Sequence, residues 1–466
     1  MSESLLHHTA DLANAFLESV ENRFVGARAT AAELRATLDI AFPEQREAAE
    51  VVLDDLAGRA DRAIVASTGP RFFGFVIGGA LPAAIAADWM TVAWDQNAGL
   101  FVLSPLAAVI EEVTARWVLE STGLPAGCSV GFVTGAQMAN FAALAAARHA
   151  VLRKAGWNVE EQGLIGAPPI RILAGGEAHV TIYTALRMLG LGTGIVETAD
   201  ADEQGRMRPE ALRALLAGRS GPTIVCAQAG NVNTGAFDPL REIAAVTREH
   251  DGWLHVDGAF GLWAKASPEH AHLAGGIELA DSWATDAHKW LNVPQDSGIV
   301  IVRDSAAHRA AMTADASYLQ KADGAERDEV DWVPDFSRRA RGFAVYAALR
   351  SLGREGLADL VARCCRHARR MAELLASDRR VEVLNEIVLN QALIRFHAPG
   401  RDADELTRAV IARIQQEGTC WLGGTQWQGK TAMRVSVSNW RTTDEDVDRS
   451  VEAILRCLDA EASSAA

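Results

Sequence analysis

The pattern of hydrophobic and polar positions predicts alternating strands and helices across the middle of the chain. Short apolar runs that fit buried strands cover residues 129–133, 170–174, 194–196, 223–228, 253–256, 282–285 and 298–302. Apolar residues at helical spacing fill most of the intervals, as in 138–154, 180–189, 209–216 and 239–250. This alternation favours an α/β fold in which helices cover both faces of a large, mostly parallel seven-stranded sheet. The short interval before 298–302 predicts a turn into an antiparallel strand.

The regions that flank this alternation have other patterns. The N-terminal part carries helical periodicity and no strand, whereas the C-terminal part mixes short strands with helices. We therefore predict an N-terminal helical segment (1–70), a large α/β domain (71–345) and a smaller C-terminal α+β domain (346–466). Residues 313–335 are charged and poor in apolar periodicity, which predicts a mobile loop.

Composition narrows the class of protein. Of 466 residues, 49% are hydrophobic and 60 acidic residues outnumber 45 basic ones, for a formal charge of −15. So acidic a chain argues against binding to nucleic acid or to an anionic membrane. The six cysteines are scattered without a Cys-x-x-Cys pair, as expected in a reducing compartment. No signal peptide or membrane span is predicted, and we expect a cytoplasmic enzyme that uses no metal.

Two residues carry the main chemical hypothesis. Lys289, one of only five lysines, follows the predicted strand 282–285, and Asp257 ends the predicted strand 253–256. An amine and a carboxylate at the ends of neighbouring strands are what pyridoxal phosphate needs. The amine binds the aldehyde of the cofactor, and the carboxylate keeps the ring nitrogen protonated.

Other residues at strand ends allow two interpretations each. The turn 135–137 either offers backbone N–H groups to a phosphate or is an ordinary strand–helix turn. His179 either stacks on a cofactor ring or begins a helix, and with Lys289 and Asp257 in the same sheet we favour stacking. Asn231 either faces the cofactor or forms a turn, and the sequence does not decide between the two.

His255 and Asp257 also form a His-x-Asp pair, with both side chains on one face of a strand. Such a pair begins the facial triad of some iron enzymes. Those sites belong to all-β barrels, so we give this alternative little weight in an α/β pattern.

Four motifs occur in order along the chain: Gly176-Glu-Ala-His179, His255-Val-Asp257-Gly-Ala259, Asp286-Ala-His288-Lys289 and Ser337-Arg-Arg-Ala-Arg341. Together they resemble the group II pyridoxal-phosphate-dependent decarboxylases, the family of the aromatic amino acid, glutamate and diaminobutyrate decarboxylases. The resemblance implies fold type I of the pyridoxal-phosphate-dependent enzymes. It also implies a homodimer with active sites at the subunit interface, and conversion of an L-amino acid to its amine and CO₂.

The resemblance further implies a role for individual residues. Lys289 binds pyridoxal 5'-phosphate covalently, Asp257 pairs with the ring nitrogen, and His179 and Ala259 cover the two ring faces. The residues matched to phosphate binding and to the histidine before the lysine are Gly135, Ala136, Gln137 and His288.

The chain departs from the family pattern at two informative positions. Asp286 stands where the family usually has an asparagine near the phosphate, and an acid there repels phosphate unless it points away or is hydrogen-bonded. The position at which aromatic decarboxylases carry a loop tyrosine falls near Glu329, and loss of that tyrosine is associated with aldehyde formation. An aldehyde synthase or a transaminase is therefore the alternative activity, and a non-catalytic homologue is a more remote one.

Overall fold

The computed structural model describes residues 3–314, 316–317, 319–321 and 326–463. The chain divides into two compact units, and each is described by itself. The larger unit comprises Gly78–Arg369 and Asn385–Ala392; the smaller comprises Met1–Ile77, Arg370–Leu384 and Leu393–Ala466. The division into domains 1–70, 71–345 and 346–466 stays a prediction.

The larger unit is built on a seven-stranded sheet with the strand order β1-β7-β6-β5-β4-β2-β3. The strands are β1 (Ser129–Val133), β2 (Arg171–Gly175), β3 (Val196–Ala199), β4 (Thr223–Gln228), β5 (Trp253–Asp257), β6 (Ser282–Asp286) and β7 (Gly298–Val302). Strands β2, β3, β4, β5 and β6 run parallel to one another, whereas β7 is antiparallel to both β6 and β1. Both the mostly parallel sheet and the antiparallel final strand are thus confirmed.

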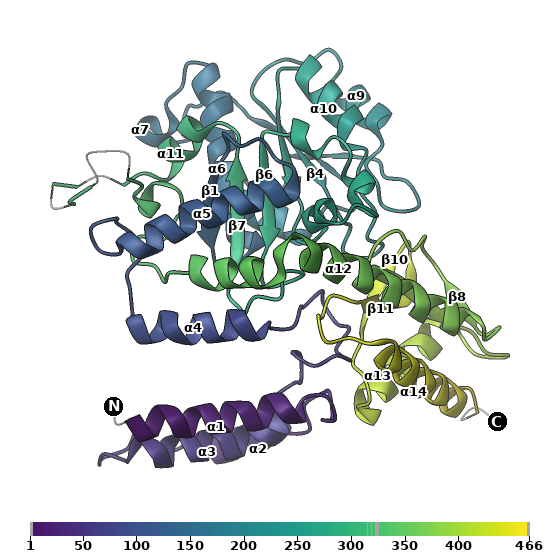
Figure 1. Cartoon of the computed structure of the whole chain (residues 1–466). Helices are drawn as coiled ribbons and strands as arrows, with labels where there is room; N and C mark the ends of the chain where they lie inside the picture. Colours follow the sequence, from purple (N-terminus) through teal and green to yellow (C-terminus); the bar gives the residue numbers. More distant parts are fainter. Residues whose placement is uncertain (1–2, 315, 318, 322–325, 464–466) are drawn as a thin grey trace. The chain divides into compact units, whose positions relative to one another are not determined.

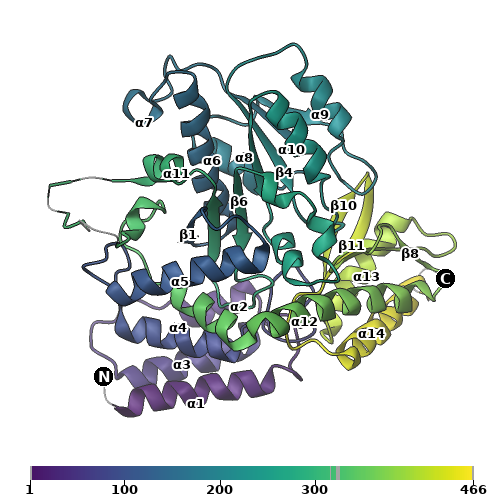
Figure 2. The same ribbon diagram turned by 45° about the horizontal axis from the view of Figure 1, so that its top comes forward.

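Helices cover the sheet of the larger unit (Figures 1 and 2). The helices of this unit before α12 are α4 (Pro82–Trp94), α5 (Pro105–Thr122), α6 (Ala136–Lys154), α7 (Val159–Gln162), α8 (Val180–Met188), α9 (Pro209–Leu216), α10 (Leu240–Glu249) and α11 (Ser305–Met312). The short 3-10 helices are η1 (Gly261–Ala266), η2 (Ala271–Ala274), η3 (Ile277–Leu279) and η4 (Glu329–Asp331). Every residue of β1, β4, β5, β6 and β7 is buried, which requires cover on both faces.

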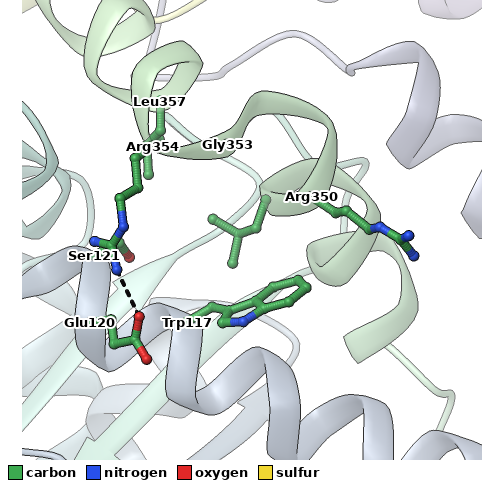
Figure 3. A pocket seen from close by; sticks show the side chains of 8 residues that line it. Trp117, Glu120, Ser121, Arg350, Gly353, Arg354 and Leu357 are labelled. Atoms are coloured by element: carbon green, nitrogen blue, oxygen red, sulfur yellow. Dashed lines mark hydrogen bonds and ion pairs between the residues drawn. The ribbon is translucent and has the colours of Figure 1, made fainter.

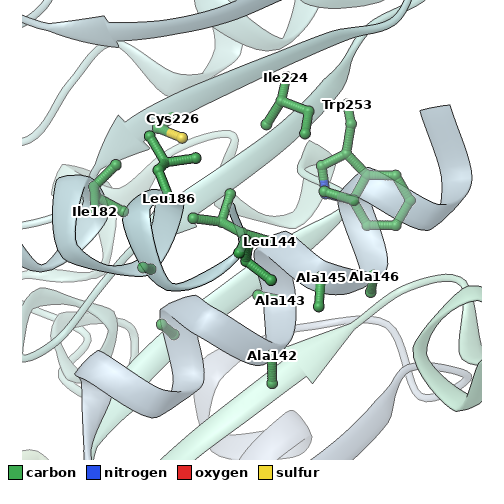
Figure 4. Close-up of a cluster of buried hydrophobic side chains, with 14 of the residues drawn as sticks. Ala142, Ala143, Leu144, Ala145, Ala146, Ile182, Leu186, Ile224, Cys226 and Trp253 are labelled. Atoms are coloured by element: carbon green, nitrogen blue, oxygen red, sulfur yellow. The ribbon is translucent and has the colours of Figure 1, made fainter. Parts of the chain in front are cut away.

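The core beside the site is formed by α6. Its sequence is rich in alanine, the residue most favourable to helix formation, and the small side chains let the helix lie close to β5, β6 and β7. Figure 4 shows this contact, in which α6 packs against α8 and the sheet through Ala142, Ala143, Leu144, Ala145, Ala146, Ile182, Leu186, Ile224, Cys226 and Trp253. The start of α6 is thereby fixed at the end of β1.

The smaller unit combines the two ends of the chain. It contains α1 (Glu3–Ser19), α2 (Ala31–Leu38), α3 (Ala49–Ala63), α13 (Ala403–Glu417) and α14 (Asp444–Ser463). Its sheet has the order β10-β11-β9-β8, formed by β8 (Val381–Val383), β9 (Gln391–Phe396), β10 (Gly423–Trp427) and β11 (Lys430–Ser436). A buried ion pair of 3.0 Å between Arg71 and Asp446 links the N-terminal part of this unit to α14.

Some elements differ from the sequence prediction. Helices α4 and α11 and strand β10 were not predicted, and helix α12 (Gly342–Ala376) is interrupted at Gly353, where φ is 62°. Of the predicted mobile loop 313–335, residues 315, 318 and 322–325 lie outside the described residues. None of the helices that the structure describes has the length and apolarity needed to cross a bilayer.

Candidate functional site

The candidate site lies where β5 and β6 end. These strands are parallel neighbours, and Asp257 is paired in register with Ala284. Asp257 is the last residue of β5, and Lys289 follows the last residue of β6 by three positions. Both functional groups therefore leave the sheet at the edge formed by the carboxyl ends of parallel strands, which is where ligands bind in such folds.

The carboxylate of Asp257 is buried and receives three hydrogen bonds. Its Oδ1 accepts the backbone N–H of Ala259 at 3.1 Å. Its Oδ2 accepts Nδ2 of Asn140 at 3.1 Å and the hydroxyl of Thr181 at 3.4 Å. These donors fix the orientation of the carboxylate. The nearby thiol of Cys226 shows how dry the region is, because burial, with a smaller contribution from the Asp257 charge, raises its pKa to about 12.

Asn140 was missed by the sequence analysis. It lies on α6, one helical turn after Ala136, and its side chain is fully buried. The i, i+4 spacing from the turn 135–137 was the available signal, since residues four apart share a helix face. Its Oδ1 lies 2.9 Å from Nε2 of His255, and Nδ1 of His255 lies 3.0 Å from the hydroxyl of Ser282.

Both ring nitrogens of His255 are thus hydrogen-bonded within the protein, which leaves neither free for a metal. Burial lowers the pKa of His255 to about 4, so the ring is neutral at neutral pH. Among the residues that the structure describes, no three His, Cys, Asp or Glu side chains are grouped so that they could hold a metal ion. The facial-triad alternative therefore has no support from the geometry.

His179 is linked to Asp257 through Thr181. It is the N-cap residue of α8, and its Nδ1 lies 2.8 Å from Oγ1 of Thr181. The same hydroxyl lies 3.4 Å from Oδ2 of Asp257. Ala259 belongs to the same region, since its carbonyl accepts the backbone N–H of Asp286 at 2.8 Å.

The turn 135–137 brings the start of α6 against the beginning of β7. Gly135 is the N-cap of α6, and a Cβ on Gly298 would lie 2.4 Å from Cα of Gly135, so only glycine fits at Gly298. The N–H of Ala136 donates to Oδ1 of Asp286 at 2.5 Å. The amide of Gln137 points toward Sδ of Met188, 3.9 Å away.

Asp286 and the two residues near it in sequence form an ionic cluster. Nζ of Lys289 lies 3.1 Å from Oδ2 of Asp286, and Nε2 of His288 lies 3.6 Å from Oδ1. Nδ1 of His288 accepts the N–H of Ser297 at 3.1 Å, and burial lowers the pKa of His288. Because Nδ1 accepts, the proton of the neutral ring lies on Nε2 and faces Asp286.

Asn231 is placed in a turn. Its Oδ1 accepts the N–H groups of Asn233 and Thr234 at 2.8 and 3.2 Å, and its Nδ2 lies 3.4 Å from the carbonyl of Glu177. These contacts are those of the turn interpretation. A role of Asn231 in cofactor binding stays a prediction.

A separate cavity lies between α5 and α12. Figure 3 shows the ring of Trp117 forming one side, and an ion pair of 2.7 Å joins two other lining residues, Arg354 and Glu120. The cavity has a volume of about 260 Å³ and shares no residue with the cluster around Lys289. The chemistry therefore points to the strand ends rather than to this cavity.

The strand-end site could hold a small aromatic cofactor that carries an aldehyde and an anionic group. Lys289 provides the amine, Asp257 a buried carboxylate, and the start of α6 a backbone donor. An amine, a carboxylate and a backbone N–H are thus the functional groups of the site.

Comparisons with known proteins agree with this set. Residues 32–398 match the family described as "Pyridoxal-dependent decarboxylase conserved domain". The chain is 27% identical over 457 residues to 4-hydroxyphenylacetaldehyde synthase of Rhodiola rosea, with 94% of this chain and 91% of the relative covered. It is 30% identical over 399 residues to an acidic amino acid decarboxylase of Bos taurus, with 81% and 76% covered. The crystal structure of Oryza sativa TDC with PLP and tryptamine superposes with a TM-score of 0.91 at 24% identity, covering 98% of this chain and 97% of that one.

Proposed function

The chain belongs to the family of pyridoxal-phosphate-dependent decarboxylases, and we propose that it converts an L-amino acid to the corresponding amine and CO₂. The observation that carries the proposal is the buried Asp257 carboxylate, held by three donors beside the strand that leads to Lys289. The fold is fold type I, and the cofactor of the family is pyridoxal phosphate.

The residues of the site fit this cofactor. Bound pyridoxal phosphate supplies an aldehyde that condenses with amines and a ring that accepts electrons from the bond being broken. Lys289 would hold it covalently, and His179 and Ala259 would cover the two ring faces. The phosphate end would be held by the start of α6, with Gly135, Ala136, Gln137 and His288.

Asp257 has the most clearly supported role. Three hydrogen bonds hold its carboxylate in one orientation. With the cofactor bound, the Asp257 carboxylate would face the ring nitrogen and hold a proton there, which would support the electron-accepting chemistry that the ring supplies. The protein thereby supplies fixed electrostatic stabilisation at the place where charge develops.

The proposal is tested with a panel of L-amino acids and the purified protein loaded with pyridoxal phosphate. We expect at least one amino acid to change the visible spectrum and to release amine and CO₂ in equal amounts. If every amino acid leaves the spectrum unchanged and no CO₂ is released, the chain is a non-catalytic homologue.

A second activity is favoured by one position. Near Glu329, where aromatic decarboxylases carry a loop tyrosine, the chain has a buried carboxyl group paired with Arg327 at 3.0 Å. An aldehyde synthase would consume the amino acid with one O₂ and one H₂O and release the aldehyde, CO₂, ammonia and H₂O₂. Hydrogen peroxide and ammonia in the panel experiment would identify this activity in place of amine formation.

We also propose that the chain forms a homodimer with active sites at the subunit interface. The support is an apolar face on α4 and α5 that is exposed in the larger unit, formed by Trp89, Met90, Val92, Trp94, Leu106 and Val109. Large apolar side chains left exposed on two helices are candidates for an interaction site, and a symmetric pair of chains is the most common way to cover them.

A further inference from the structure

The side chain of Asp286 lies between the two groups that the cofactor needs. Its Oδ1 accepts the N–H of Ala136 at 2.5 Å, and its Oδ2 lies 3.1 Å from Nζ of Lys289. Only 3% of the side chain is exposed. Under the proposed function, the first of these partners would bind the cofactor phosphate and the second would bind the cofactor aldehyde.

The backbone of Asp286 is fixed on both sides. Its N–H donates to the carbonyl of Ala259 at 2.8 Å, and its carbonyl accepts Nε1 of Trp263 at 3.0 Å. The strand therefore cannot shift to withdraw the carboxylate. Only rotation of the side chain, which would break its contacts with Ala136 and Lys289, can move the charge away.

The position also suits an anion. The start of α6 carries the positive end of the helix dipole, and Nε2 of His288 lies 3.6 Å from Oδ1 of Asp286. Gly135 leaves space there, because a Cβ on this residue would lie 3.4 Å from Oδ1 of Asp286 and 3.2 Å from Cε1 of His288. Asp286 is thus an anion of the protein itself at the place proposed for the phosphate.

We propose that Asp286 competes with the cofactor at both ends and makes the chain hold pyridoxal phosphate loosely enough to exchange it. The phosphate and the carboxylate repel each other and share one backbone donor, and Lys289 has to leave its ion pair before it can bind the aldehyde. Asp286 therefore sets the affinity for the cofactor. This inference rests on the proposed function and adds a determinant of cofactor retention to it.

The test compares dissociation constants of the wild-type protein and Asp286→Asn. Binding is followed by quenching of tryptophan fluorescence, which requires no turnover. The ligands are pyridoxal 5'-phosphate and pyridoxine 5'-phosphate, which has the ring and the phosphate but no aldehyde. We expect the variant to bind both ligands at least about tenfold more tightly, because like charges in close contact are strongly unfavourable. Pyridoxal without phosphate should gain less.

Asp296→Asn is the matched control. Asp296 is in the loop between β6 and β7, where its half-exposed side chain pairs with Arg341 at 3.0 Å. The control removes the same charge from the same region without touching Ala136 or Lys289, and its affinities should stay within about twofold of the wild type.

Equal or weaker binding of pyridoxine 5'-phosphate by a folded Asp286→Asn protein would overturn the inference. Asp286→Ser, which removes the charge but keeps an oxygen acceptor, provides a second test if the amide variant does not fold. Failure of the proposed function has another signature. In that case neither the wild type nor any variant would bind pyridoxal 5'-phosphate with visible absorbance.

Discussion

Nδ2 of Asn140 lies 3.1 Å from Oδ2 of Asp257 and donates to it, which completes a hydrogen-bond chain with a single direction. Nε1 of Trp253 donates to the hydroxyl of Ser282 at 2.8 Å. The direction is set at the carboxylate end: Asn140 turns its amide N–H toward Asp257 and its Oδ1 toward Nε2 of His255, which therefore carries the ring proton. Nδ1 of His255 is left to accept the hydroxyl of Ser282. The carboxylate thus orients the amide, and the network holds both in place.

Asn140→Ala should lower kcat about 10- to 100-fold, because a hydrogen bond to a charged group contributes roughly 1.5–3 kcal/mol. The loss should fall on kcat more than on KM, since Asn140 contacts Asp257 rather than the substrate. Steady-state kinetics with the amino acid identified in the panel measure both constants. Asn140→Asp should be worse than Asn140→Ala, because it places a second carboxylate beside Asp257. An alanine variant that changes KM alone would contradict the role.

Asp257→Ala should slow turnover by at least about 100-fold, the range seen when a fixed electrostatic contact is removed from an active site. It should affect folding far less, because the side chain occupies a polar network rather than the apolar core. Turnover and urea unfolding of the same preparation give the two quantities. A large loss of unfolding free energy together with modest loss of turnover would make Asp257 a structural residue.

Lys289→Ala should abolish both turnover and the visible absorbance that bound pyridoxal phosphate has when it is linked to the protein, because Lys289 is the amine of the site. The measurement is an absorption spectrum of protein that has been incubated with the cofactor and then dialysed to remove what is not bound. Lys154→Ala is the control, since Lys154 is an exposed lysine at the end of α6. Unchanged absorbance in the Lys289 variant would exclude this lysine as the point of attachment.

The sequence predicted the parts of the site that depend on strand ends. Hydrophobic periodicity located β5 and β6, so the sequence alone was enough to place Asp257 and Lys289 at one edge of a sheet. Asn140 was missed because a polar residue in an alanine-rich helix reads as an ordinary helical position. The direction of its amide depends on Asp257 and His255, which are far away in the sequence.

Side-chain rotation is the other kind of information that the sequence lacks. The sequence identified Asp286 as an unusual acid near the expected phosphate. Its contacts with Ala136 and Lys289 depend on the rotamer of the side chain, which the sequence does not give. In the same way, the sequence left Asn231 open between cofactor and turn. Its contacts with Asn233 and Thr234 depend on the turn geometry of the folded chain.

The contribution of His255 to the unfolding free energy should fall as the pH is lowered from about 6.5 to about 4. Burial lowers the pKa of His255 from 6.5 to about 4, so in this range the unfolded chain takes up a proton that the folded chain refuses. The group contributes up to about 1.4 kcal/mol per pH unit. Urea unfolding at several pH values should therefore show a shallower dependence for His255→Gln than for the wild type.

Some pH dependence should remain in the His255 variant. Burial also lowers the pKa of His308, to about 3, which acts in the same direction. His7→Gln, a substitution of an exposed histidine on α1, is the control and should leave the pH dependence as it is in the wild type. If the unfolding free energy of His255→Gln depends on pH as it does in the wild type, His255 takes up its proton as readily in the folded protein as in the unfolded chain.

Val92→Glu should convert the proposed homodimer to monomers. Val92 is 62% exposed on α4, within the apolar face that we propose is covered by the second chain, and burying an unpaired carboxylate there is costly. Light scattering after size-exclusion chromatography at micromolar concentration gives the mass. Ile165→Glu is the matched control, because Ile165 is 96% exposed in the same unit but lies outside α4 and α5. Since the active sites are proposed to lie at the interface, Val92→Glu should lose turnover along with the dimer. A wild-type protein that is monomeric in this measurement would contradict the proposed interface.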